Sequence, residues 1–170
     1  MSGSLYGKAH IGHNGTGVVE VAGGTMSGGT FFVGVNSEGR LELRGGTVNG
    51  GLVCGHGAHG HGVVEMSRGT LQSSTPEIGR SGFGEFRFRG GWVAANDLTL
   101  GSANGGRGEL YVDAEDSLTL NSSFLCGYFG QGTATQRSFM QQTYLKIGAN
   151  TNSVSELTIL AIQLGIFDLP

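Results

Sequence analysis

Residues 11–26 have the sequence IGHNGTGVVEVAGGTM, and this order of residue types recurs down most of the chain. An apolar residue precedes a glycine, a polar loop ends in another glycine, and an alternating segment leads to a double glycine. Repeats of 20–50 residues are typical of stacked structural units, none of which can bury its apolar face alone. The first pair of the motif occurs at Ile11-Gly12, Val33-Gly34, Cys54-Gly55, Ile78-Gly79, Leu100-Gly101, Cys126-Gly127 and Ile147-Gly148.

The segments that follow the loop glycines indicate the secondary structure of each unit. The steps between the paired glycines are 22, 21, 24, 22, 26 and 21 residues. Apolar and polar residues alternate with a period of two, which places every second residue on one side of a strand. We therefore expect a strand in each repeat, with two more short strands beside it, and one inward column of equivalent residues: Val19, Leu41, Val64, Phe86 and Leu110.

This pattern predicts an all-β fold, a single-stranded parallel β-helix or β-solenoid with about seven rungs of ~22 residues, which we expect to be right-handed. The alternative is a β-sandwich with glycine-rich turns, whose hairpins would have no fixed period. Even spacing favours the solenoid. Its corners also explain the composition, because glycine makes up 34 of 170 residues and adopts the backbone angles of sharp turns.

The repeats divide the domain into two parts. We expect regular solenoid repeats over residues 1–127, and irregular rungs with a cap over residues 128–170 of the same domain, because the pattern loosens from Gln131. The tail has two interpretations, both open at this stage. Residues 154–159 form a last strand, or the chain forms a short capping helix with its apolar face made by Val154, Leu157, Leu160, Ala161 and Leu164.

Charge and hydrophobicity limit the partners of this chain. Ten Lys and Arg residues against thirteen Asp and Glu residues give a net charge of −3, so a nucleic-acid partner is not expected. The N-terminus has neither a basic start nor an apolar run, and we expect no signal peptide. The apolar segment at residues 157–169 is too short and too interrupted to predict a membrane span. A cytoplasmic protein and a piece of a larger exported protein both fit.

Residues 11–26, 33–48 and 78–93 resemble the glycine-rich repeats of autotransporter passenger domains. The closest likeness is to the repeats associated with PEP-CTERM and type V secreted proteins, and it covers about residues 5–127. The resemblance implies an exported β-helix at the cell surface with an adhesive or structural use.

The two cysteines, Cys54 and Cys126, occupy the same column of the repeat, three rungs apart. Rungs stack at about 4.8 Å, so roughly 14 Å would separate them. A disulfide needs Cα atoms within about 7 Å. We therefore expect two free, buried, apolar thiols.

His56, His59 and His61 form the densest cluster of titratable residues. Three imidazoles so close in sequence could hold Zn²⁺ or Ni²⁺, which makes them the candidate metal ligands. The alternative is a solvated loop, favoured by the glycines on every side, because a metal site needs preorganised ligands.

Glu20, Glu42 and Glu65 fall on one outward column, and Arg87 continues it. A face covered by ion pairs is the favoured interpretation, over a ladder of Ca²⁺ sites, because the aspartates of glycine-rich calcium repeats are missing. No paired carboxylates and no Ser/His/Asp arrangement are recognisable. We therefore predict that the chain is not an enzyme and needs no cofactor.

Phe32, Val53 and Leu125 are predicted to point outward as an apolar stripe, which would be a lateral contact surface; scattered exposed residues are the alternative. The sequence thus predicts a structural or adhesive solenoid that self-associates end to end or laterally, as a homo-oligomer or filament. A carbohydrate-binding or polysaccharide-acting β-helix is the first alternative. Metal binding through the His-rich loop is the second.

Overall fold

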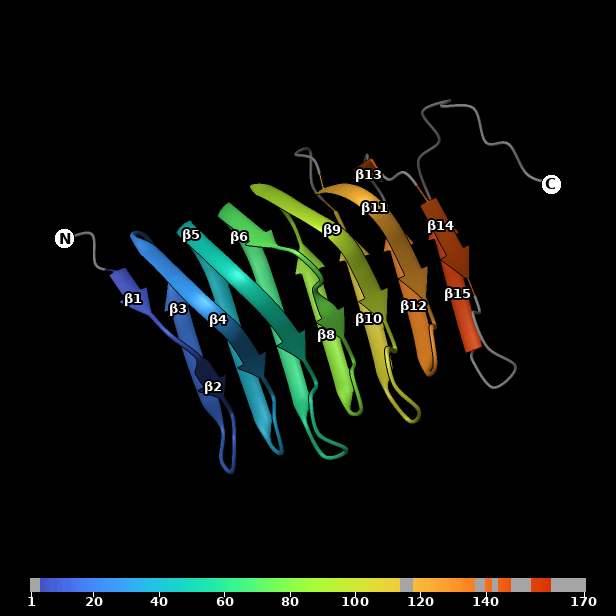
Figure 1. The fold of residues 1–170 in the computed structure, drawn as a ribbon, viewed down its shortest axis with the longest axis horizontal. Helices are drawn as coiled ribbons and strands as arrows, with labels where there is room; N and C mark the ends of the chain where they lie inside the picture. Colours follow the sequence, from blue (N-terminus) through green and yellow to red (C-terminus); the bar gives the residue numbers. More distant parts are fainter. Residues whose placement is uncertain (1–3, 114–117, 137–139, 142–143, 148–153, 160–170) are drawn as a thin grey trace.

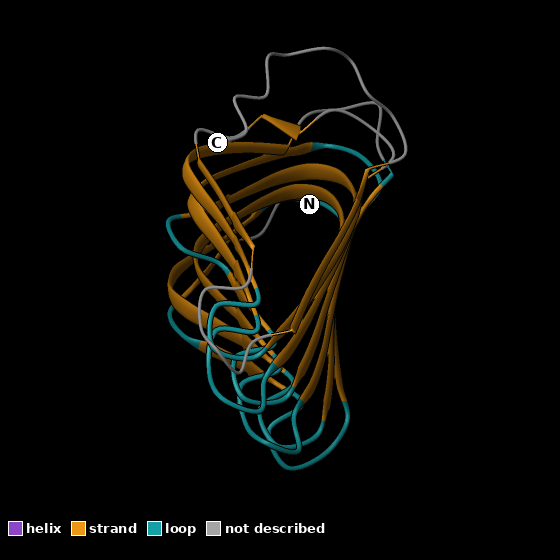
Figure 2. Cartoon of the chain, turned by 90° about the vertical axis from the view of Figure 1, so that its right-hand side faces the viewer, coloured by secondary structure: helices purple, strands orange, loops and turns teal. Residues whose placement is uncertain are grey.

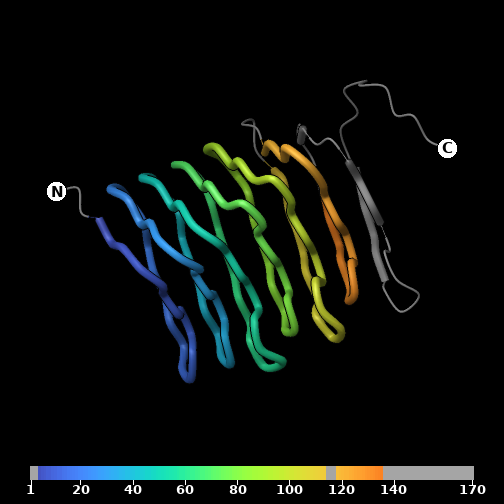
Figure 3. The backbone as a smooth tube through the Cα atoms, viewed as in Figure 1, coloured from blue at the N-terminus to red at the C-terminus, as the bar shows by residue number. Residues whose placement is uncertain are grey.

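The protein is a parallel β-solenoid of about six turns in a computed structural model, close to the seven rungs predicted (Figure 1). The structure describes residues 4–113, 118–136, 140–141, 144–147 and 154–159, and side chains as far as residue 135. These residues form strands and loops and no helix, so the predicted all-β class is confirmed. The tube drawing shows the same coil repeated along one axis (Figure 3).

All the strands belong to one sheet, in which each strand pairs in parallel with its equivalents in the neighbouring turns. Their bounds are β1 Ser4–Tyr6, β2 Ala9–Ile11, β3 Gly17–Val21, β4 Thr25–Val33, β5 Glu38–Cys54, β6 His61–Ser73, β7 Glu77–Ile78, β8 Phe83–Phe88, β9 Trp92–Leu100, β10 Arg107–Val112, β11 Leu118–Cys126, β12 Gln131–Gln136, β13 Met140–Gln141, β14 Tyr144–Ile147 and β15 Val154–Ile159.

Each turn of the coil has three sides, which β5 traverses in full. Side 1 contains residues 38–44 of β5, together with β3, β8, β10, β12 and β15. Side 2 contains residues 47–49 of β5 and β1. Side 3 contains residues 51–54 of β5, together with β2, β7 and β14. Seen along the axis, two long walls converge on a stack of loops, and a curved wall joins them at the other end (Figure 2).

The pairing register confirms the predicted stacking. Val33 lies between Ile11 and Cys54, and the same column continues through Ile78, Leu100, Cys126 and Ile147. The column predicted on side 1, from Val19 to Leu110, is also in register.

The core is a continuous apolar stack along the axis of the solenoid. Phe31, Phe86, Phe88 and Phe124 are its largest fully buried side chains. Burying one such side chain stabilises the fold by about 1.5–3 kcal/mol. Because every rung adds side chains to the same columns, neighbouring rungs stabilise one another.

Glycine is required where sides 3 and 1 meet at the loops, as Gly79 and Gly84 illustrate. Gly79 has φ of +72°, and a Cβ atom there would lie 2.0 Å from the carbonyl oxygen of Arg107 in the next turn. A Cβ atom on Gly84 would lie 2.2 Å from the amide nitrogen of Gly79. The chain therefore enters and leaves each loop too closely for any side chain, which explains the glycines that define the repeat.

The regular register extends past residue 127, where the repeat was expected to become irregular. β12 and β15 pair in register over six residues each, although Gln136 follows apolar residues in its column. Of the two interpretations of the tail, the strand at residues 154–159 is confirmed. The rest of the alternative helix, with Leu160, Ala161 and Leu164, lies outside the described residues. Over the described part of the chain, no helix has the length and apolar character to span a membrane.

Candidate functional site

The outer surface of side 1 carries most of the fixed charge of the solenoid. Glu20, Glu42, Glu65, Arg87 and Tyr111 follow one another in register along the axis, as predicted for the first four. They face outward because the residues on either side of them in each strand belong to the core. Stacked carboxylates repel one another at the spacing of adjacent strands, unless cations are placed between them.

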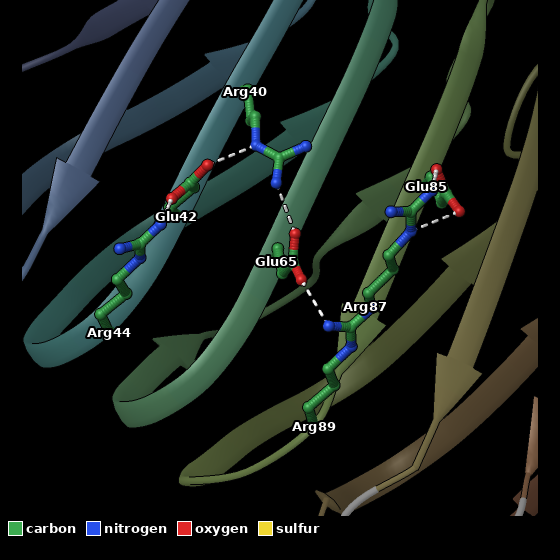
Figure 4. Close-up of polar contacts among 7 residues, drawn as sticks. All are labelled: Arg40, Glu42, Arg44, Glu65, Glu85, Arg87 and Arg89. Atoms are coloured by element: carbon green, nitrogen blue, oxygen red, sulfur yellow. Dashed lines mark hydrogen bonds and ion pairs between the residues drawn. The ribbon is translucent and has the colours of Figure 1, made fainter.

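Arginines from neighbouring columns supply these cations (Figure 4). The guanidinium of Arg40 donates to Glu42 within its own turn and, from Nη2, to Oε2 of Glu65 in the next turn, at 2.6 Å. Arg44 donates to the other oxygen of Glu42, and Arg89 lies 3.0 Å from Oε1 of Glu65. The network thus joins three successive turns, and the predicted ion-paired face is confirmed.

Two further glutamates, Glu85 and Glu109, are stacked directly on one another and are 7 % and 8 % exposed. Both nitrogens of the Arg87 fork donate to Glu85, at 2.7 and 2.9 Å. Glu109 accepts hydrogen bonds from Arg107 and from the hydroxyl of Tyr111. These partners offset the hydration that the two side chains lose on burial.

Hydrogen bonds between the side chains of side 1 also shift the pKa values of several of them. Hydrogen bonds from Arg40 and then Arg44 lower the pKa of the Glu42 carboxyl. The hydrogen bond to Glu42 raises the pKa of Arg44, and the one to Glu109 raises the pKa of Tyr111. Each shift favours the protonation state that the group already has at neutral pH. Side 1 is therefore suited to hold a fixed charge pattern rather than to exchange protons.

The histidines predicted as metal ligands lie in different surroundings. The ring of His56 meets Phe32 edge-on, with the centroids 5.0 Å apart, whereas His61 packs on Phe83 at 4.9 Å. His59 is exposed. Among the residues that the structure describes, no group of three His, Cys, Asp or Glu side chains is arranged to hold a metal ion.

A different pair of histidines is close together. The Nδ1 atoms of His10 and His13 are 3.4 Å apart, and His10 packs against Phe32 on the side away from His56. Burial, and then the charge of Arg80, lower the pKa of His56. His10 and His56 therefore both lie against Phe32, whereas His61 lies against Phe83.

The predicted apolar stripe on side 3 is interrupted. Phe32 and Val53 are neighbours in register, but Glu77 and Thr99 separate them from Leu125. Val53 is 5 % exposed, which differs from the expected outward display, and Phe32 and Leu125 are half-buried. The alternation along the strand predicts that these side chains point away from the core, but it does not predict how far neighbouring residues bury them.

Cys54 and Cys126 are buried and are not joined in a disulfide, as predicted. Burial raises the pKa of the Cys54 thiol to about 12, and its sulfur lies 3.7 Å from the carbonyl oxygen of Glu85. A thiol held in this neutral form is a core residue and a poor nucleophile.

The N-terminal end of the solenoid exposes its core. Leu5 is the first member of a core column that continues through Met26, Val48 and Leu71, yet it is 57 % exposed. Each of β1, β2 and β3 has one pairing partner among the described strands, so their other edges are open. Alignment of Leu5 with Met26 places Leu5 in this core column, a position that the motif at Ile11-Gly12 does not itself indicate.

Comparisons of this chain with protein-family models, with curated proteins and with solved structures found no match. The resemblance to autotransporter passenger repeats therefore stays a prediction.

Proposed function

We propose that this chain is a non-enzymatic structural β-solenoid that self-associates end to end, with the last rung of one copy stacked on the first rung of another. The observation that carries the proposal is the exposed core at the N-terminal end. Leu5 occupies a core position at 57 % exposure, beside three strands with open edges. Open strand edges next to apolar residues are a template for pairing with another chain.

The register positions of the last rung match those of the first. Met140 continues the column of Leu5, and Ile147 continues that of Ile11. Leu157 and Ile159 continue the columns that begin with Val19 and Val21. A second copy placed in register would therefore extend four core columns with apolar residues, which is why it is the favoured occupant of the open end.

The free energy gained when two ends stack is modest, so we expect assembly to be reversible. Ile11 and Val21 are already 3 % and 7 % exposed, so most of the newly buried area comes from Leu5 and the half-buried Val19. Two such side chains and their partners contribute roughly 1.5–3 kcal/mol each, and each new edge hydrogen bond adds about 0.5–1.5 kcal/mol. Association itself costs roughly 4–15 kcal/mol. We therefore expect concentration-dependent assembly, with dissociation constants in the roughly micromolar range.

Leu5→Lys tests the proposal, because it places a charge at the open core while removing little from the monomer. Trp92→Lys is the matched control: Trp92 is 44 % exposed and lies on β9, which pairs with strands of the turns on both sides and so is away from either end. Sedimentation velocity should show the mass of the unmodified chain and of the control rising with concentration, and Leu5→Lys remaining a monomer. A monodisperse monomer at all concentrations up to the millimolar range, or assembly of Leu5→Lys like that of the unmodified chain, would contradict it.

A further inference from the structure

A second surface, on the bend between sides 2 and 3, is hollowed into an open groove of about 450 Å³ that crosses β5, β6, β9 and β11. Its polar side chains include four amides: Asn49, Gln72, Asn96 and Asn121. The other described residues that line it are glycine, serine and alanine, so the whole lining is uncharged. The groove is therefore distinct from the ion-paired surface of side 1.

The amides follow the axis of the solenoid from turn to turn. Asn49 and Gln72 are neighbours in register, and the amide nitrogen of Asn121 donates to Oδ1 of Asn96 at 3.4 Å. Adjacent turns advance by about 4.8 Å, which is close to the length of one pyranose unit. The register shifts between Leu120 and Ser123, so a β-bulge re-aims side chains at this bend.

One lining residue has an unused polar group. Ser73 is 4 % exposed, and its hydroxyl has no hydrogen-bond partner among the described residues. Buried polar groups in native proteins nearly always have a partner. The Ser73 hydroxyl is buried beneath the groove, so the amides, and not this hydroxyl, are the groups available to a ligand.

An exposed aromatic residue stands next to the groove. Trp92 is 44 % exposed and precedes Ala94, which lines the groove, by two residues of β9. Residues two apart in a strand point to the same face and lie roughly 6.5 Å apart. The indole therefore offers a flat apolar surface beside the row of amides.

We propose that this groove binds a neutral polysaccharide whose chain runs along the solenoid axis. Amide groups both donate and accept hydrogen bonds, which suits sugar hydroxyls, and the indole suits the apolar face of a pyranose ring. An uncharged lining gives no reason to prefer an acidic polymer. The proposal does not depend on end-to-end assembly.

Trp92 is the only tryptophan of the chain, so its fluorescence reports on this site alone. The probes are hydroxyethyl cellulose, galactomannan and dextran, with polygalacturonate as the acidic comparison. We expect at least one neutral polymer to shift the emission in a saturable way and to protect Trp92 from acrylamide quenching. Gln72→Ala should weaken this binding about three- to ten-fold, as expected for a lost hydrogen bond.

Phe129→Ala is the matched control, because Phe129 has nearly the same exposure as Trp92 but lies in the loop stack. It should bind like the unmodified chain, whereas Trp92→Ala should lose retardation in affinity electrophoresis. Asn49→Ala, at an exposed position, replaces Gln72→Ala if that variant does not fold by circular dichroism. No response to any neutral polymer, equal binding by the amide variant, or a response to polygalacturonate alone would overturn the proposal.

Discussion

Replacing Gly79 by alanine should destabilise the solenoid far more than a glycine-to-alanine change elsewhere in the loop stack. Two effects act together at this position. The backbone has φ of +72°, a left-handed conformation that costs an alanine about 1–2 kcal/mol. The new Cβ would also lie 2.0 Å from the carbonyl oxygen and 2.2 Å from the carbonyl carbon of Arg107 in the next turn.

Two other glycines separate these effects. Gly105 has φ of +80° with nothing within 4 Å of a Cβ, so Gly105→Ala should cost only the backbone term of about 1–2 kcal/mol. Gly15 has open space and no left-handed φ, so Gly15→Ala should change stability by no more than about 0.5 kcal/mol. For Gly79→Ala we expect a loss above about 4 kcal/mol, because the backbone of a neighbouring turn must move.

Urea unfolding followed by circular dichroism measures all three variants against the unmodified chain. Complete loss of the folded state in Gly79→Ala would agree with the expected size, since domains are stable by only about 5–15 kcal/mol. Equal losses for Gly79→Ala and Gly105→Ala would refute the argument, because they would show that successive turns do not approach as closely as described.

Two further predictions concern charge. Between about pH 9 and pH 12 the thiol of Cys54 keeps its proton in the folded state but loses it when unfolded, so the free energy of unfolding should fall as pH rises. This residue should contribute up to about 1.4 kcal/mol per pH unit to the slope of the free energy of unfolding against pH, and Cys54→Ala should remove that contribution. Urea titrations at several pH values measure the slope for both proteins. Identical slopes would show that the thiol is not shielded. Glu65→Gln should lower stability by about 1 kcal/mol or less, since its partners Arg40 and Arg89 are substantially exposed. High salt should reduce the difference, and a salt-independent loss would argue against an ion-pair origin.

The core columns and the charged column could be predicted from the sequence because both rest on local, repeated rules. A period of two decides which side a residue faces, and the fixed glycines decide where each turn begins. These rules placed Val33 beside Ile11 and Cys54, and Glu42 beside Glu20 and Glu65.

The surroundings of a side chain were harder to predict than its direction. Val53 follows the alternation but is buried, and His61 lies over Phe83 while His56 lies against Phe32. Alignment of the turns would have separated His61 from His56, since His61 and Phe83 share a column. The amide groove was missed because its four amides do not share one column: Asn49 and Gln72 pair in register, but Gln72 pairs with Ala94, two residues before Asn96.

Disulfide cross-linking tests most directly whether equivalent residues of successive turns lie side by side in parallel. In a chain with Cys54→Ala and Cys126→Ala, the pair Thr47→Cys and Thr70→Cys should oxidise readily, because these positions pair in register across adjacent parallel strands about 4.8 Å apart. The pair Thr25→Cys and Thr70→Cys, two turns apart, should stay reduced within the monomer. Cross-linking of the second pair and not the first would contradict the stacked solenoid.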